Sequence, residues 1–160
     1  MKNKETIEKA LLYQDRLAES PDTCRVLAKL YAEHRPLSAR AYAMKARRLG
    51  GTGVAVSPNY VAEKVEADPY GAFLLGQELC YLERYDEAYS YLEAAGKSAD
   101  LSIAPTAALF IADLLSHHLP GEKALIREWY DRAAILGNPD VISGGREARE
   151  HECSLFPFAV

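Results

Sequence analysis

The sequence has few cysteines, and the three that it has, Cys24, Cys80 and Cys153, lie far apart without any C-x-x-C pair. An odd number of cysteines in this spacing argues against a disulfide framework and favours a reducing compartment, so we expect a cytoplasmic protein. Basic residues are also fewer than acidic ones, and the formal net charge is -4. Because the chain offers no basic field to attract phosphates, nucleic acid is not an expected partner.

Long hydrophobic runs are missing as well. The longest, residues 101–115, contains Pro105 and Asp113 and is shorter than the ~20 residues that a membrane-spanning helix needs. The first residues, MKNKETIEKA, contain no apolar run of the kind found in a secretory signal. We therefore expect neither a membrane partner nor a secretory leader.

Apolar residues are nevertheless abundant, at 49% of 160 residues, which is enough for one continuous core. Helical periodicity runs along almost the whole chain, and strand-like alternation appears only near residues 54–56. These features predict an all-α protein with a single domain, 1–160.

One helical spacing occurs three times. Its members stand at i, i+3, i+4 and i+7, with an aromatic residue second and an alanine last: Ala39, Tyr42, Ala43 and Ala46; Ala88, Tyr91, Leu92 and Ala95; Ile126, Trp129, Tyr130 and Ala133. These positions form one face of a helix. We expect the aromatic residue on each face to fill the gap between successive structural units.

Three prolines, at positions 21, 69 and 105, each mark an expected helix start, where proline gives up no needed N–H. Ser20 and Asp68 precede two of them and are good capping residues, whereas Ala104 is a poor one. Seven residues after each proline stands a small residue: Ala28, Gly76 and Ala112. A small residue there allows the partner helix to come close.

The sequence therefore predicts three antiparallel helical hairpins with turns near residues 34–36, 83–84 and 117–121. The first helix, 4–19, should bury Ile7, Ala10, Leu11, Tyr13, Leu17 and Ala18. The expected organisation is an N-terminal capping helix (1–20), repeat A (21–50), an insertion (51–68) with a short helix at 58–67, repeat B (69–98), repeat C (105–137), and a degenerate capping segment (138–160). Its apolar tail, 154–160, either caps the last hairpin or is available to another chain, so that a homo-oligomer stays an open alternative.

The residues WYDRAAILGNP, preceded by LFIAD and LLSHH, resemble a Sel1-like repeat, a relative of the tetratricopeptide repeat. The stretches LLGQEL and RYDEAYSYLEAA in repeat B are similar to either type. The resemblance covers residues 21–137, but the glycine-rich turn usual in Sel1-like repeats is absent and the repeat spacing is uneven. It implies a divergent α-solenoid used for protein–protein recognition, and stacked hairpins would also bury one another's apolar faces.

Helical geometry then places one set of side chains on the first-helix face that points away from the paired helix, where we expect a partner-binding groove. The candidate partner-binding residues are Arg25, Lys29, Tyr70, Phe73, Gln77, Tyr81, Asp113 and His117. Aromatic residues in such a position are typical of interface hot spots. The alternative is that Phe73 and Tyr81 pack under the helix expected at 58–67.

No pattern predicts catalysis, a metal or a cofactor. The adjacent His117 and His118 would point about 100° apart on a helix, and residues 151–153 lack the spacing that places two histidines on one face. The GGTG stretch at 50–53 lacks the following G-K-[ST] of a phosphate loop and is interpreted as a helix stop. Cys24 and Cys80 are expected to be small core or groove residues.

The leading hypothesis is a protein-binding adaptor or chaperone-like module, not an enzyme, that holds a segment of another protein in its groove. The alternative is a dedicated inhibitor, such as an immunity protein, that covers the active site of a cognate enzyme or toxin.

Overall fold

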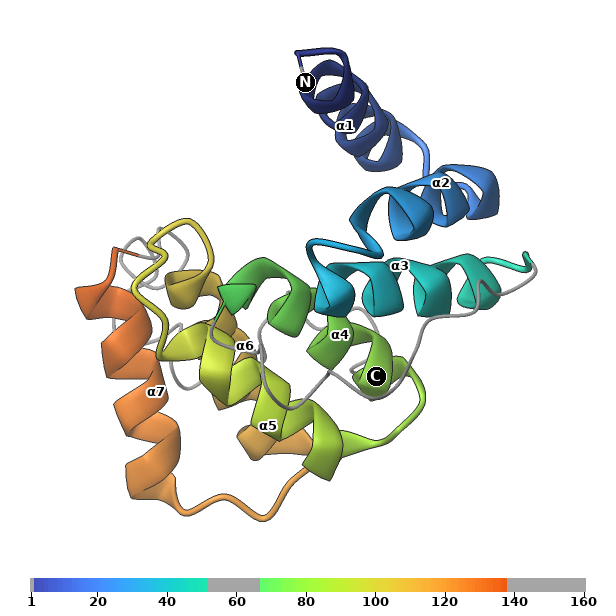
Figure 1. Cartoon of the computed structure of the whole chain (residues 1–160). Coiled ribbons are helices and arrows are strands. Elements are labelled where there is room, and N and C mark those ends of the chain that lie inside the picture. Colours follow the sequence, from blue (N-terminus) through green and yellow to red (C-terminus); the bar gives the residue numbers. More distant parts are fainter. Residues whose placement is uncertain (1, 52–66, 138–160) are drawn as a thin grey trace. The chain divides into compact units, whose positions relative to one another are not determined.

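The computed structural model describes residues 2–51 and 67–137 (Figure 1). Across these two ranges there are seven α-helices and no strand, so the predicted all-α class is confirmed. The chain divides into two compact units, Met1–Lys64 and Val65–Val160, which are described separately below. The helix expected at 58–67, the segment 138–160 and its tail 154–160 lie outside the described residues.

The first unit contains α1 (Lys2–Leu17), α2 (Pro21–Tyr31) and α3 (Pro36–Arg48). Helix α2 begins at the predicted proline, and the Ser20 side chain caps it by accepting a hydrogen bond from the Thr23 backbone N–H at 3.2 Å. The short link at 32–35 makes α2 and α3 an antiparallel pair. Inside this hairpin the rings of Tyr31 and Tyr42 stack with 5.9 Å between their centroids.

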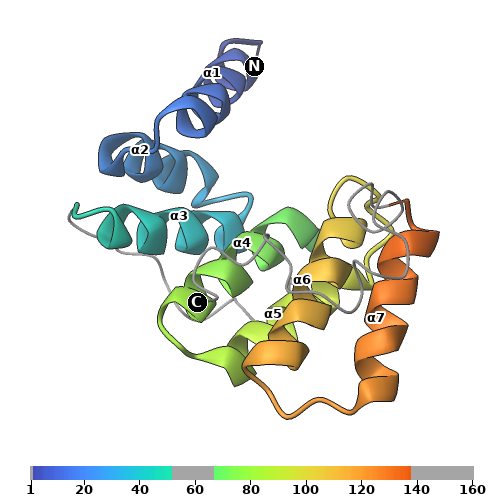
Figure 2. The same cartoon turned by 180° about the vertical axis from the view of Figure 1, so that it is seen from behind.

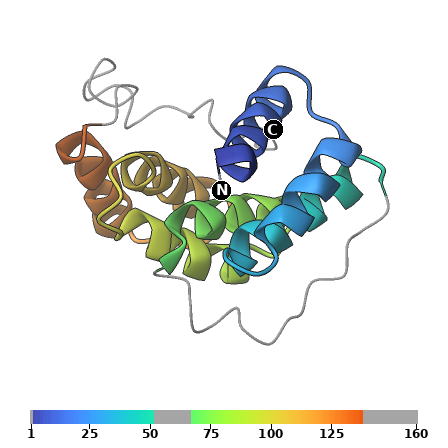
Figure 3. The same cartoon turned by 45° about the horizontal axis from the view of Figure 1, so that its top comes forward.

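The prediction that α1 buries its apolar side chains is wrong for most of them. Ile7, Tyr13 and Leu17 are 52%, 64% and 69% exposed, and Ala10 and Ala18 are exposed too, while Leu11 is half-buried. Polar contacts hold a different side of α1 against α2 and α3, because Asp15 and Glu8 bind residues of the hairpin. Figures 2 and 3 show α1 beside α2 and at an angle to it.

The second unit contains four helices, each packed on the next along the chain. Their bounds are α4 (Pro69–Tyr81), α5 (Tyr85–Gly96), α6 (Ala104–His117) and α7 (Lys123–Ile135). Asp68 caps α4 by accepting a hydrogen bond from the Gly71 backbone N–H at 3.0 Å. Helix α6 begins one residue before Pro105, at Ala104, and Ala104 is not its N-cap.

Gly76 permits the close approach of α4 and α5 that its position predicted. A Cβ at this position would lie 2.6 Å from Leu92 Cγ and 3.3 Å from the Ala88 carbonyl oxygen. Gly96 has the same role where α5 meets α6 and α7, because its Cβ would lie 2.9 Å from the Trp129 ring and 3.2 Å from Ile111 Cδ1. The helices thus touch backbone to side chain at these two glycines.

The three repeated aromatic residues have different surroundings. Tyr42 is buried within its own hairpin against Tyr31, and Tyr91 is only half-buried. Trp129 is buried on α7, with its ring against Gly96 at the end of α5. In the second hairpin Leu92, the neighbour of Tyr91, takes the buried position opposite Gly76.

Two glycines with positive φ end helices: Gly50, at 96°, follows α3, and Gly137, at 95°, follows α7. Such a left-handed residue lets the backbone N–H groups beyond it bond back to the last turn, as the Gly51 N–H does to the Ala46 carbonyl at 2.9 Å. None of the helices in the described ranges has the length and apolar character needed to cross a membrane.

Candidate functional site: two hollows beside helix α5

The structure separates the eight predicted groove residues by their burial. Phe73 and Asp113 are buried, with Phe73 7% and Asp113 0% exposed. Four are half-buried: Arg25, Tyr70, Gln77 and Tyr81. The other two, Lys29 and His117, are exposed. Arg25 forms an ion pair with Asp22 on the same helix.

Phe73 and Asp113 therefore cannot present their side chains on a groove surface as expected. The Phe73 ring meets the Phe110 ring of α6 edge-on, with 5.7 Å between centroids. Asp113 accepts a hydrogen bond from the Tyr130 hydroxyl of α7 at 3.0 Å. The reason is that α6 packs against both α5 and α7, so a face that hairpin geometry alone leaves open becomes part of the core.

Tyr70, Gln77 and Tyr81 share one side of α4, as the helical spacing requires. His117 lies near the end of α6, where its Nδ1 is 2.9 Å from the Asp113 carbonyl oxygen. These residues stay candidates for partner contact, because their side chains retain some access to solvent.

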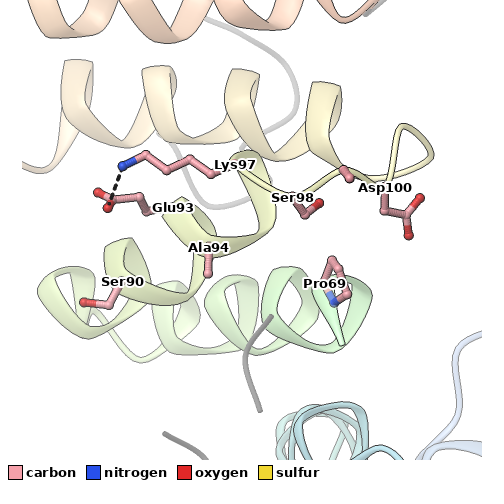
Figure 4. A pocket seen from close by; sticks show the side chains of 8 residues that line it. Pro69, Ser90, Glu93, Ala94, Lys97, Ser98 and Asp100 are labelled. Carbon is pink, nitrogen blue, oxygen red and sulfur yellow. Dashed lines mark hydrogen bonds and ion pairs between the residues drawn. The ribbon is translucent and has the colours of Figure 1, made fainter. Parts of the chain in front are cut away.

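A hollow of about 650 Å³ lies in the second unit, between the start of α4 and the last turns of α5 (Figure 4). We call it the first hollow, and its lining residues are Pro69, Ser90, Glu93, Ala94, Lys97, Ser98, Ala99 and Asp100. Figure 4 shows Glu93 and Lys97 joined at one end, with Ser98 and Asp100 at the other and Pro69 facing them from α4. Hydroxyl, carboxylate and ammonium groups thus line the hollow together with the apolar Pro69, Ala94 and Ala99.

A second hollow of about 420 Å³ lies between α5 and α7. Its lining residues are Tyr89, Glu93, Lys97, Leu125, Glu128, Trp129 and Arg132. The Arg132 guanidinium is held in place because its Nε donates a hydrogen bond to the Gly96 carbonyl at 2.8 Å. Glu93 and Lys97 line both hollows and so separate them.

The shared pair has a simple geometry: Lys97 Nζ lies 3.0 Å from Glu93 Oε1, one helical turn away. Its side chains are 60% and 35% exposed, so the pair contributes little to stability and its charges stay available to a ligand. In the second hollow, burial raises the pKa of Tyr89, and the hydrogen bond and charge of Glu93 raise it further, whereas Trp129 lowers it. The Tyr89 hydroxyl is therefore protonated at neutral pH.

The two described cysteines are placed unfavourably for nucleophilic attack. Burial raises the pKa of the Cys80 thiol to about 12, and burial together with the Asp15 charge does the same for Cys24. Thiols with such pKa values are protonated at neutral pH and are poor nucleophiles. Within 2–51 and 67–137, no group of three or more His, Cys, Asp or Glu side chains is arranged to hold a metal ion.

Reasoning from the sequence missed both hollows, although one signal for them was present. Glu93 and Lys97 stand at i and i+4 on α5, which is the spacing of a helix-surface ion pair. That pattern is common on solvated helices and does not indicate that the pair lies between two depressions.

Comparison of the chain with protein-family models, curated proteins and solved structures finds no match in any of the three.

Proposed function

We propose that this chain is a protein-interaction module, without a catalytic role, that binds an extended segment of a partner protein in the cytoplasm. Its hairpins would stack as a short α-solenoid related to Sel1-like and tetratricopeptide repeats. The observation that carries the proposal is the pair of adjacent hollows in the second unit, which share Glu93 and Lys97 on α5.

The shape and lining of the hollows favour a peptide over a compact small molecule. Small-molecule sites are usually enclosed and largely apolar, whereas these two depressions are open and lie side by side along α5. Together they offer donors at Lys97 and Arg132, and acceptors at Glu93 and Glu128. An extended main chain has donors and acceptors along its whole length and can use both kinds of group.

The charges in the hollows indicate the composition of the segment. In the second hollow, Lys97 and Arg132 balance Glu93 and Glu128, and the first hollow adds Asp100 to the shared pair. A polar segment with little net charge is therefore the expected ligand, because a strongly charged one would meet a like charge in each hollow.

Ser90 provides the most direct test, because it is exposed on α5 and lines the first hollow. Ser90→Trp fills the hollow, and Ser116→Trp is the matched control, since Ser116 is an exposed helix residue on α6 outside both hollows. We expect the immobilised full-length chain to retain a specific protein from a lysate of its source cells. Ser90→Trp should reduce the amount retained by about tenfold, a loss of ~1.4 kcal/mol, and Ser116→Trp should leave it unchanged.

The outcomes separate the function from the site. If the wild-type chain retains no protein above a denatured control, the interaction function is wrong. If it retains a protein equally well with either substitution, the hollows are not the site, and Tyr70→Ala with Tyr81→Ala then tests the face of α4. Lys97→Glu should also weaken capture, because it replaces a donor with an acceptor and repels Glu93.

A further inference from the structure

Helix α1 presents apolar side chains that the described residues of the first unit, 2–51, leave uncovered. Three large hydrophobic side chains of α1 are more than half exposed: Ile7, Tyr13 and Leu17. With about 100° between successive residues, they lie on one side of the helix together with Ala10 and Ala18, and these five side chains are exposed. The exposed polar residues Asn3, Thr6 and Gln14 lie among them on the same side.

The opposite side of α1 is acidic and is already occupied by the α2–α3 hairpin. Asp15 binds Lys45, with 2.7 Å between Oδ2 and Nζ, and Glu19 binds the same ammonium group at 3.2 Å. Glu8 accepts a hydrogen bond from the Tyr31 hydroxyl at 2.8 Å and lies 3.7 Å from Arg35. Three of the acidic side chains of this segment are therefore engaged on the hairpin side.

Basic side chains consequently dominate the borders of the apolar face. Lys9 and Arg16 flank it on the Tyr13 side and Lys4 on the Ile7 side, and all three are exposed. Lys9 pairs with Glu5 at 3.0 Å, whereas Lys4 and Arg16 form no ion pair with any residue in 2–51 or 67–137. The exposed half of α1 thus combines apolar side chains and three uncharged polar ones with a net positive border.

We propose that this face of α1 docks an acidic amphipathic helix of a partner protein, whose apolar residues would cover Ile7, Tyr13 and Leu17. Helices recognise one another through apolar residues at i, i+3, i+4 and i+7, and the charges beside that stripe select the partner. Carboxylates at the edges of the incoming helix would meet Lys4, Lys9 and Arg16. This surface lies in the first unit and is independent of the hollows beside α5.

Charge also bears on two other occupants of such a face, a second copy of the chain and an anionic membrane. A second copy of the chain would bring its own Lys4, Lys9 and Arg16 against these residues, and like charges repel. An anionic membrane would attract the basic border of this face, but it would also repel a protein whose net charge is -4.

Two synthetic peptides test the proposal. Both carry leucines at the i, i+3, i+4 and i+7 positions of a helix, one with glutamates and the other with lysines at the flanking positions. Each is labelled with fluorescein and titrated with the full-length chain. We expect the glutamate peptide to bind at least about tenfold more tightly than the lysine peptide, and salt to reduce the difference.

Variants assign the binding to α1. Leu17→Asp should weaken binding of the glutamate peptide by about tenfold or more, whereas Ile135→Asp, at an 83% exposed position of α7, should not. Arg16→Glu should weaken it as well. Because these side chains are exposed, circular dichroism melts should show that all three variants stay folded.

Several results would overturn the proposal. The first two are equal affinity for the two peptides and equal effects of Leu17→Asp and Ile135→Asp on binding of the glutamate peptide. A third is that the chain binds phosphatidylglycerol vesicles and shows no preference for the glutamate peptide. A fourth is a dimer in sedimentation that Leu17→Asp dissociates. Ser90→Trp should leave peptide binding unchanged, so failure of this proposal and failure of the site beside α5 are distinguishable.

Discussion

Lys45 of α3 and Asp15 of α1 form a largely buried ion pair, with side chains 13% and 10% exposed and 2.7 Å between Nζ and Oδ2. The other carboxylate oxygen of Asp15 accepts a hydrogen bond from the Cys24 thiol at 3.5 Å. Burial disfavours the charged form of Lys45, but the hydrogen bond and charge of Asp15, with the charge of Glu19, outweigh it and raise the Lys45 pKa. One lysine therefore connects α1 to the hairpin.

Lys45→Met should destabilise the protein strongly, because it leaves the buried Asp15 carboxylate without its counter-charge. The expected loss in the free energy of unfolding is on the order of 3 kcal/mol, measured by urea denaturation. The double variant Lys45→Met with Asp15→Leu should lose less, since neither charge is then buried alone. A double variant as unstable as the single one would contradict this account.

Stability should decline at alkaline pH because of the two buried thiols. Each thiol has a pKa of about 12 in the folded chain against 9.0 for an unperturbed cysteine. The stabilisation is fully present below the unfolded value and is lost as the pH rises from about 9 towards 12, because the unfolded chain releases these protons first. Between about pH 8 and pH 10, each thiol should account for about 1 kcal/mol of lost stability.

Cys80→Ala tests this contribution, since burial alone raises the Cys80 pKa. The variant should show a smaller fall in the free energy of unfolding between these two pH values than the wild type does. An unchanged pH dependence would show that the Cys80 thiol has no part in it. Cys80 should also react with a thiol reagent only after the protein unfolds.

Trp129→Ala should remove much of the stability of the second unit, because the indole is buried where α7 meets the end of α5. Truncating a buried tryptophan typically costs about 3–5 kcal/mol. Ile135→Ala, at an exposed position of the same helix, is the matched control and should change the melting midpoint little. Equal midpoints for the two variants would contradict the packing of α7 on α5.

Gly76→Ala is informative because two effects oppose each other. Alanine in place of glycine favours a helix interior by about 1 kcal/mol, whereas overpacking costs about 1–3 kcal/mol. The new Cβ would lie 2.6 Å from Leu92 Cγ, so we expect the steric effect to dominate and the melting midpoint to fall. A higher midpoint would mean that α4 and α5 separate without cost.

The helix starts were predictable from the sequence because their causes are local. A proline in the first turn acts within that turn. A capping side chain also acts locally, because Ser20 and Asp68 each accept a hydrogen bond from the backbone N–H three residues further on. The close approach at Gly76 was predictable for a similar reason, since a residue without a Cβ inside a helix indicates a tight contact.

The environment of α1 and the candidate site were not predictable in this way. Apolar periodicity identifies the stripe of Ile7 and Leu17 but not whether anything covers it, and Lys45 and Asp15 are 30 residues apart in sequence. Asp113 looks like a surface residue until α7 is placed beside α6. The first hollow depends on where α4 begins and α5 ends relative to each other, and the second on how α7 lies beside α5, which no single helix encodes.

Gly96 has a further consequence for the way the second unit folds. Its carbonyl accepts the Arg132 hydrogen bond while its missing side chain makes room for Trp129, so both features hold α7 against the end of α5. Amide hydrogens of α7 should therefore exchange with solvent no more slowly than those of the last turn of α5, since detachment of α7 exposes both. The contact of α7 with the end of α5 thus depends on a position that carries no side chain.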